Sequence, residues 1–165
     1  MARDRQYEYV ILGGGVVAGY AARTFVEHGV EPGQLAILSA DAHLPYERPS
    51  LSKEFLAGDK NEPEVLINSE EYYDEHGIDV HLETAVGAVD FDRKAIYADG
   101  DPIGYQGLMI ATGARPHTFD LPGADLTGIH YLRGMHDAQQ IRQAAEEATS
   151  AVVIGGSFIG MEVAS

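Results

Sequence analysis

The feature that most constrains the fold is an apolar run that leads into a glycine-rich turn, and this pattern occurs twice. The first copy, at residues 9–19, reads YVILGGGVVAG, and the second, at residues 151–162, reads AVVIGGSFIGME. In each copy the apolar run favours a buried strand, and the turn opens a helix. Residues 35–38 form the next apolar run. The first copy therefore predicts a βαβ unit, which builds parallel sheets covered by helices.

The remaining patterns predict an α/β fold of the Rossmann-like, three-layer kind with a small β-hairpin insertion, followed by the first strand and helix of a second Rossmann unit. A helix should begin at Val16 and end before Gly29. The dipeptide at residues 99–100 is a hairpin turn signal. The other predicted elements are helices at 50–56, 68–77, 137–149 and 158–165, and strands at 8–12, 85–89, 94–98, 108–110 and 151–154. A domain boundary near residue 149 divides 1–149 from 150–165.

Composition excludes several function classes. The 165 residues carry 26 acidic and 11 basic side chains, a formal net charge of −15, which argues against a nucleic-acid partner. A well-solvated acidic surface explains this charge, and an acidic face for a basic partner is the alternative. The chain has no cysteine, which excludes a disulfide, a thiolate metal site and a thiol relay. No metal spacing, membrane span or signal segment stands out, so we expect a cytoplasmic protein without a metal site.

The first turn has small residues at the three places that a dinucleotide-binding turn requires. Gly13 permits the tight turn, Gly15 lets a pyrophosphate approach the backbone, and Ala18 lets the helix pack closely on the strand. The start of the helix then offers free N–H groups to phosphate. An acidic residue should follow the second strand and hold a ribose hydroxyl. Asp41 has that position, and a solvent-facing loop aspartate is the alternative.

Four segments in order resemble one family, and together they span essentially the whole chain. They are the opening turn, PYERPSLSK at residues 45–53, ATGARP at residues 111–116, and the second glycine turn. The chain resembles the FAD-dependent pyridine nucleotide-disulfide oxidoreductases. The branch concerned lacks a redox disulfide and contains monodehydroascorbate reductases, ferredoxin reductases and apoptosis-inducing-factor-like proteins. The resemblance implies an N-terminal fragment with an FAD-binding domain at 1–149 and the start of an NAD(P)-binding domain at 150–165.

The resemblance also implies which residues bind the cofactors. The FAD ligands would be Gly13, Gly14, Gly15, Val16, Val17, Ala18, Asp41, Arg48, Lys53, Val86, Ala111, Thr112, Gly113, Arg115 and Arg133. Arg48 would bind near the phosphates, where a guanidinium group suits phosphate geometry. Gly134 follows Arg133 where the family branch often has an acid. The NAD(P)H ligands would be Gly155, Gly156, Ser157, Phe158, Ile159 and Gly160, and Ser157 replaces the middle glycine of the simplest pattern.

Lys53 and Glu162 are the catalytic candidates that the resemblance implies. They would form an ion pair beside the flavin ring, where the lysine stabilises the negative charge that the ring gains and the carboxylate holds the lysine. From the residues alone, a solvated helix lysine is the favoured interpretation of Lys53. Glu162 is equally a first-turn acid stabilised by the helix dipole.

The resemblance implies an enzyme that passes electrons from NAD(P)H through FAD to a one-electron acceptor. The acceptor would be the monodehydroascorbate radical or a small ferredoxin-like redox protein, with no nucleic acid or membrane as partner. Two alternatives remain: a redox or signalling flavoprotein of the apoptosis-inducing-factor type, and a non-catalytic FAD-binding fragment. We expect the 165 residues alone to be inactive. The residue that would choose between NADH and NADPH lies beyond Ser165.

Overall fold

A computed structural model describes residues 5–98 and 102–165 of the chain. The chain divides into two compact units. The first consists of residues up to 46 together with 66–113, and the second consists of 47–65 and 114–165. Residues 114–149 and 150–165, on either side of the predicted boundary near residue 149, both belong to the second unit. The division into an FAD domain and an NAD(P) domain therefore stays a prediction.

The first unit is built on a six-stranded sheet in the order β3-β2-β1-β6-β5-β4. The parallel strands are β1 (Arg5–Leu12), β2 (Leu35–Leu38), β3 (Asp79–His81) and β6 (Ile103–Ile110). The antiparallel strands are β4 (Val86–Asp90) and β5 (Ala95–Ala98), which confirms the predicted hairpin insertion. The turn signal at residues 99–100 lies outside the described residues.

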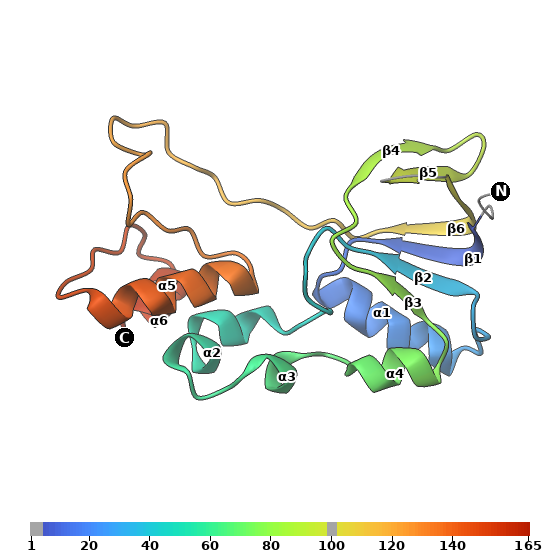
Figure 1. The fold of residues 1–165 in the computed structure, drawn as a ribbon, viewed down its shortest axis with the longest axis horizontal. Helices are drawn as coiled ribbons and strands as arrows, with labels where there is room; N and C mark the ends of the chain where they lie inside the picture. The colour runs from blue at the N-terminus through green and yellow to red at the C-terminus, as the bar shows by residue number, and fades with distance from the viewer. Residues whose placement is uncertain (1–4, 99–101) are drawn as a thin grey trace. The chain divides into compact units, whose positions relative to one another are not determined.

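Elements cover both faces of this sheet, as Figure 1 shows. Helices α1 (Val16–Glu27) and α4 (Glu70–Glu75) pack on one face, where Ile11 and Ile37 are fully buried. The β4–β5 hairpin extends the sheet beyond β6 and folds over the other face of the parallel strands. There, Ile96 is buried in one cluster with Val10. The parallel sheet with its two covering layers confirms the predicted α/β, Rossmann-like architecture.

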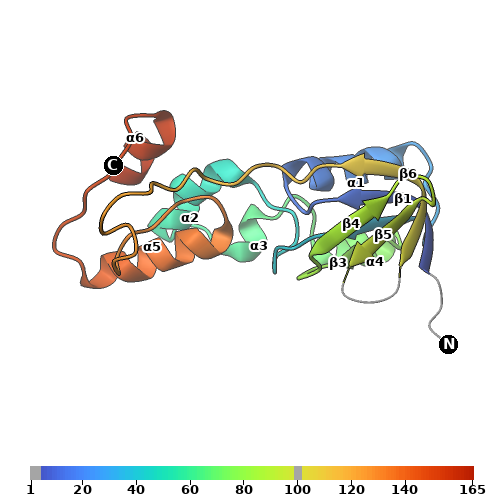
Figure 2. The same ribbon diagram turned by 90° about the horizontal axis from the view of Figure 1, so that it is seen from above.

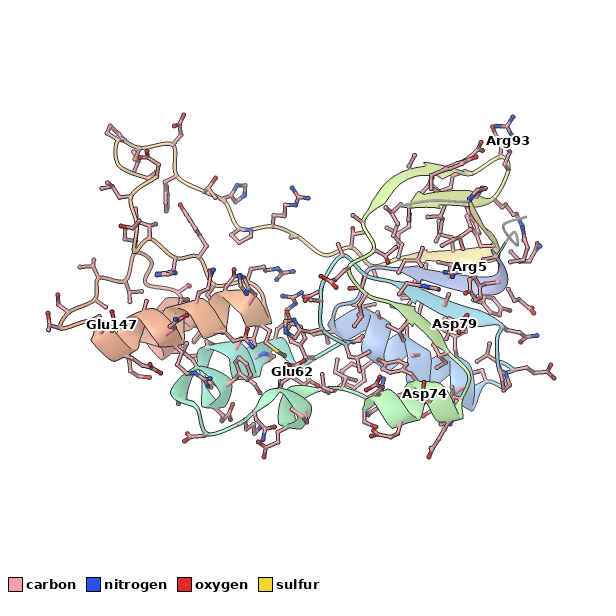
Figure 3. All side chains as sticks on the ribbon, in the orientation of Figure 1. Arg5, Glu62, Asp74, Asp79, Arg93 and Glu147 are labelled. Atoms are coloured by element: carbon pink, nitrogen blue, oxygen red, sulfur yellow. The ribbon has the colours of Figure 1, made fainter. Side chains whose placement is uncertain are left out.

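The short strand β3 was not predicted, and a polar network holds it in place. The buried Tyr7 hydroxyl donates to a carboxylate oxygen of Asp79 (2.6 Å) and lies 3.2 Å from Nε2 of His81. Figure 3 labels Arg5 and Asp79 at the end of the sheet away from the glycine turn. Burial and the Asp79 carboxylate raise the pKa of Tyr7, and burial and the Arg5 charge lower the pKa of His81.

The second unit is formed by short helical segments and one longer helix. Its elements are the 3₁₀ helix η1 (Arg48–Ser52) and the helices α2 (Glu54–Ala57), α3 (Glu62–Val65), α5 (Met135–Glu147) and α6 (Phe158–Ala164). In place of the single helix predicted at 50–56, the chain breaks at Lys53, whose backbone is not helical. Figure 2 separates α6 from α5, which overlap in Figure 1.

The strand predicted at residues 151–154 was wrong, because these residues have no regular secondary structure. The apolar side chains of Val152 and Ile154 are largely exposed. A strand is stable only when its backbone groups pair with a neighbouring strand, and no strand of the described residues pairs with this run. Among the described residues, no helix is long and apolar enough to cross a membrane.

Candidate functional site

The first glycine turn lies where β1, β2 and β6 end at the same edge of the sheet. Gly13 donates its N–H to the carbonyl of Leu38, and Ala111 donates its N–H to the carbonyl of Leu12, both at 2.8 Å. Gly13 has a φ of +117°, and a Cβ atom on it would overlap the carbonyl group of Ala111. Glycine is therefore required here both for its backbone conformation and for its lack of a side chain.

The start of α1 fits a phosphate group. Gly15 is the N-cap residue and has no side chain that could accept a hydrogen bond from the helix N–H groups. The first N–H groups of a helix have no partner within the helix, so they are available to an anion. Ala18 is fully buried, and a Cβ atom on Gly14 would overlap the buried Ser39 side chain. The turn therefore has the close packing expected of a dinucleotide-binding turn.

Val16 and Val17 lie at the start of α1, on the side that faces an apolar groove. The groove runs along α1 and reaches β6, where Met109 lines it. Val17 is exposed. Their predicted contact with the cofactor stays a prediction.

Asp41 lies just beyond β2, and its side chain is held by neighbouring groups. Its carboxylate contacts His43 and accepts a hydrogen bond from the hydroxyl of Tyr46. The segment before β4 lies alongside, because Thr84 donates its N–H to the carbonyl of Ser39 (2.7 Å). Val86, another predicted FAD ligand, begins β4 two residues later. The fold thus brings these two predicted FAD ligands to the end of β2, where the Asp41 side chain is held by its neighbours and is 33% exposed.

Ala111, Thr112 and Gly113 continue directly from the end of β6 past the first turn. The hydrogen bond from Ala111 to Leu12 fixes their start beside Gly13. Gly113 has a positive φ of +69°, which redirects the chain. Thr112 and Gly113 are exposed. The first unit therefore places these residues, the glycine turn and Asp41 at one sheet edge, where ligands of open α/β sheets bind.

In the second unit, Lys53 and Glu162 form the predicted ion pair. The Nζ atom of Lys53 lies 3.3 Å from Oε1 of Glu162, and the two side chains are 47% and 30% exposed. The Ser52 hydroxyl donates to the other carboxylate oxygen, Oε2, at 2.5 Å. The Ser52 hydrogen bond and the charge of Lys53 lower the pKa of Glu162. Glu162 does not lie in the first turn of α6, so the alternative of a first-turn dipole partner was wrong.

Arg48 and Arg133 are brought together in the same unit. The guanidinium group of Arg48 donates to the backbone carbonyl of Arg133. Asp137 accepts hydrogen bonds from the N–H groups of Arg133 (2.9 Å) and Gly134 (2.8 Å), which caps α5 and fixes this bend. Arg115 is exposed on the segment that precedes α5. Arg48 and Arg133 thus lie next to each other in the second unit.

The second glycine turn has the expected local shape but few supporting contacts. Gly155 has a φ of +128°, and a Cβ atom on Gly155 or Gly156 would meet nothing within 4 Å. Ser157 is the N-cap of α6, and its side chain makes no capping hydrogen bond. Gly160 packs against the carbonyl of Gly155, which explains the small residue there. Phe158 and Ile159 are exposed.

The match to a known family explains this arrangement of parts. Residues 7–165 match the family described as Pyridine nucleotide-disulphide oxidoreductase. The chain belongs to this family. Members bind FAD and use NAD(P)H. The redox disulfide in the family's name has no counterpart in these residues, since the chain has no cysteine.

The relatives are reductases of several kinds. The chain is 40% identical over 172 residues to a chloroplastic/mitochondrial monodehydroascorbate reductase of Arabidopsis thaliana, covering 96% of this chain and 35% of the relative. It resembles the NADH:rubredoxin oxidoreductase of Clostridium acetobutylicum with a TM-score of 0.85 and 27% identity, covering 97% of this chain and 41% of that one. It resembles a ferredoxin reductase of Rhodopseudomonas palustris with a TM-score of 0.85 and 30% identity, covering 95% and 39%. The chain thus spans well under half the length of these proteins.

Several residues of this family member's candidate sites were missed at the sequence level. They are Ser52, which contacts Glu162, the Asp41 partners His43 and Tyr46, and Asp137, which caps α5. The spacing of Asp41 and His43 is typical of an Asx turn, so a local signal existed for that pair. Ser52 had no such signal, because its partner is 110 residues away in the sequence. Among the described residues, no group of acidic or histidine side chains could hold a metal ion.

Proposed function

We propose that the protein is an FAD-dependent NAD(P)H oxidoreductase that passes electrons to a one-electron acceptor. The observation that carries this proposal is the contact of Lys53 and Ser52 with Glu162, which joins distant parts of the chain at the residues predicted to serve the flavin. NAD(P)H would give a hydride, meaning two electrons and a proton, to bound FAD, and two acceptor molecules would then take one electron each.

The chain's own residues would bind and orient the two cofactors. The turn from Gly13 to Ala18 would hold the FAD pyrophosphate through its N–H groups, and Asp41 would hold a ribose hydroxyl. Val86, Ala111, Thr112, Gly113, Arg48, Arg115 and Arg133 complete the proposed FAD set. Gly155, Gly156, Ser157, Phe158, Ile159 and Gly160 would contact NAD(P)H. Lys53 would place a positive charge at the flavin, and Glu162 would hold that charge in position.

The acceptor would be the monodehydroascorbate radical or a small iron-containing redox protein. The relative from Arabidopsis supports the first, and the rubredoxin and ferredoxin reductases support the second. Turnover of the full-length protein with NADH or NADPH and each acceptor separates the two. No turnover with either acceptor would leave only a flavin-binding role. A cytoplasmic location is also only proposed, and the chloroplastic or mitochondrial location of the Arabidopsis relative does not support it.

A substitution of Gly15 tests the FAD-binding turn. In Gly15→Val, a branched side chain would occupy the space in which the pyrophosphate approaches the backbone, so we expect the purified protein to lose its flavin absorbance. Gly87→Val is the matched control, because Gly87 lies in β4 and a Cβ atom there meets only the Tyr97 carbonyl at 3.8 Å. A yellow Gly15→Val protein would contradict the assignment of this turn.

A substitution of Lys53 tests the proposed role of the ion pair. Lys53→Ala should keep FAD bound but slow flavin reduction by NAD(P)H by roughly tenfold or more, because one nearby charge stabilises the reduced ring. The rate is measured as the anaerobic loss of flavin absorbance in a stopped-flow instrument. Lys60→Ala removes an equal charge from the same unit and serves as control. Equal rates in wild type and Lys53→Ala would rule out the role.

A further inference from the structure

The carboxylate of Asp41 has contacts on both of its oxygens. Oδ1 accepts the backbone N–H of His43 (3.2 Å) and lies 3.0 Å from Nδ1 of its ring. Oδ2 accepts the hydroxyl of Tyr46 (3.1 Å). The two rings lie nearly perpendicular, with centroids 6.3 Å apart, and the Tyr46 side chain is buried. The orientation of the carboxylate is therefore fixed from two sides.

The backbone that carries these three side chains is also anchored. Asp41 donates its N–H to the hydroxyl of Ser39 (3.1 Å), and its carbonyl accepts the N–H of Glu83 (3.0 Å). Tyr46 forms an isolated antiparallel bridge with Leu66. The His43, Tyr46 and Asp41 side chains thus form a rigid cluster within the first unit, at the end of β2.

The hydrogen-bonding capacity of a carboxylate indicates what this cluster can still bind. An ionised carboxylate has about four acceptor positions, two on each oxygen. The two contacts with His43 occupy Oδ1, provided that Nδ1 carries the ring proton. The Tyr46 hydroxyl occupies one position on Oδ2. Oδ2 therefore retains one acceptor position, which matches a single hydroxyl donor of a ribose.

We propose that His43 and Tyr46 are positioning residues for the adenosine ribose of FAD, because they orient Asp41 so that Oδ2 accepts one ribose hydroxyl. This inference rests on the proposed function, in which Asp41 holds that ribose. Neither residue touches the cofactor in this arrangement. Each acts through the carboxylate.

Flavin titrations of the apoprotein at a fixed pH test this proposal. Tyr46→Phe and His43→Ala each remove one donor to Asp41, and each should weaken FAD binding roughly fivefold, because a less well oriented carboxylate loses part of its hydrogen bond with the ribose. FMN lacks the adenosine part, so its affinity should not change. His43→Asn places an amide N–H near the position of Nδ1 and should restore most of the FAD affinity. Thermal melting of each apoprotein shows that the variant is folded.

A double-mutant cycle separates positioning from a general structural effect. Asp41→Asn should weaken FAD binding by itself, and adding His43→Ala or Tyr46→Phe to it should have little further effect. Equal losses for FAD and FMN, or additive losses in the Asp41→Asn background, would overturn the inference. If Tyr46→Phe does not fold, the His43→Ala and His43→Asn pair still decides. A wild-type protein that binds no FAD would instead refute the proposed function.

Discussion

The two glycine turns have nearly the same sequence pattern and nearly the same local backbone, but their surroundings differ completely. Gly13 and Gly155 have φ values of +117° and +128°, and a helix starts three residues after each. Before the first turn, Val10 and Ile11 are 1% and 0% exposed. Before the second turn, Val152 and Ile154 are 89% and 80% exposed.

This difference shows that the turn and the strand before it depend on different information. The positive φ of the first glycine and the helix start are local properties, so both copies adopt them. The strand needs partners on either side. β1 has β2 and β6 beside it, whereas residues 151–154 pair with no strand of the described chain. Apolar sequence alone therefore does not make a strand.

Alanine substitutions of the two leading glycines test this comparison at the turns themselves, with a large expected effect. In Gly13→Ala, the new Cβ atom would overlap the backbone of Ala111, and the positive φ would be strained. We expect the free energy of unfolding to fall by about 3 kcal/mol, since strain and overpacking each cost about 1–3 kcal/mol. Urea unfolding followed by circular dichroism measures the loss.

Gly155→Ala is the matched control for Gly13→Ala. A Cβ atom on Gly155 meets nothing within 4 Å, so only the backbone strain remains, and the unsupported turn can relax. The expected loss is about 1 kcal/mol or less. Equal losses at the two positions would show that the second turn is as tightly supported in solution as the first.

The apolar runs that precede the turns should differ by a comparable or larger amount. Ile11→Ala removes fully buried methyl groups between the sheet and α1, and it should lower the free energy of unfolding by about 2–5 kcal/mol. Ile154→Ala changes an exposed side chain and should alter it by no more than about 0.5 kcal/mol. A loss above about 1 kcal/mol in Ile154→Ala would indicate that the second run is buried against a partner in solution.

The sequence predicted those parts of the fold whose causes are local. Residues 35–38 were correctly assigned as a strand, because four successive apolar side chains are buried on both faces of a parallel sheet. β3 was missed because its two polar residues, Asp79 and His81, hide the strand pattern. Their contacts with Tyr7 stabilise it, and the sequence does not show that these residues meet. The same holds for the candidate site. Gly13 was predicted from the local pattern of its turn, whereas Ser52 joins the site only through its contact with Glu162, which is distant in the sequence.

The smallest expected effect concerns what attaches the second turn to its unit. The first turn is held by backbone hydrogen bonds and by apolar packing, and the side chains of that packing include no carboxylate. The helix after the second turn instead contacts η1 through the carboxylate of Glu162. The pKa of Glu162 is lowered in the folded state. Its contribution is therefore present above the ordinary pKa and is lost as the pH falls through the lowered one.

We therefore expect acid to release α6 before it affects the first turn. In NMR spectra recorded between neutral and acidic pH, amide signals of α6 should shift with the titration of Glu162, whereas signals of residues 13–18 should not follow it. Ser52→Ala should raise the pKa of Glu162 toward its ordinary value, because the Ser52 hydrogen bond is the largest cause of the shift. Glu162→Gln should abolish the pH response of α6. If the α6 signals stay constant until the whole protein unfolds, the carboxylate does not attach this helix, and apolar contacts must hold both turns.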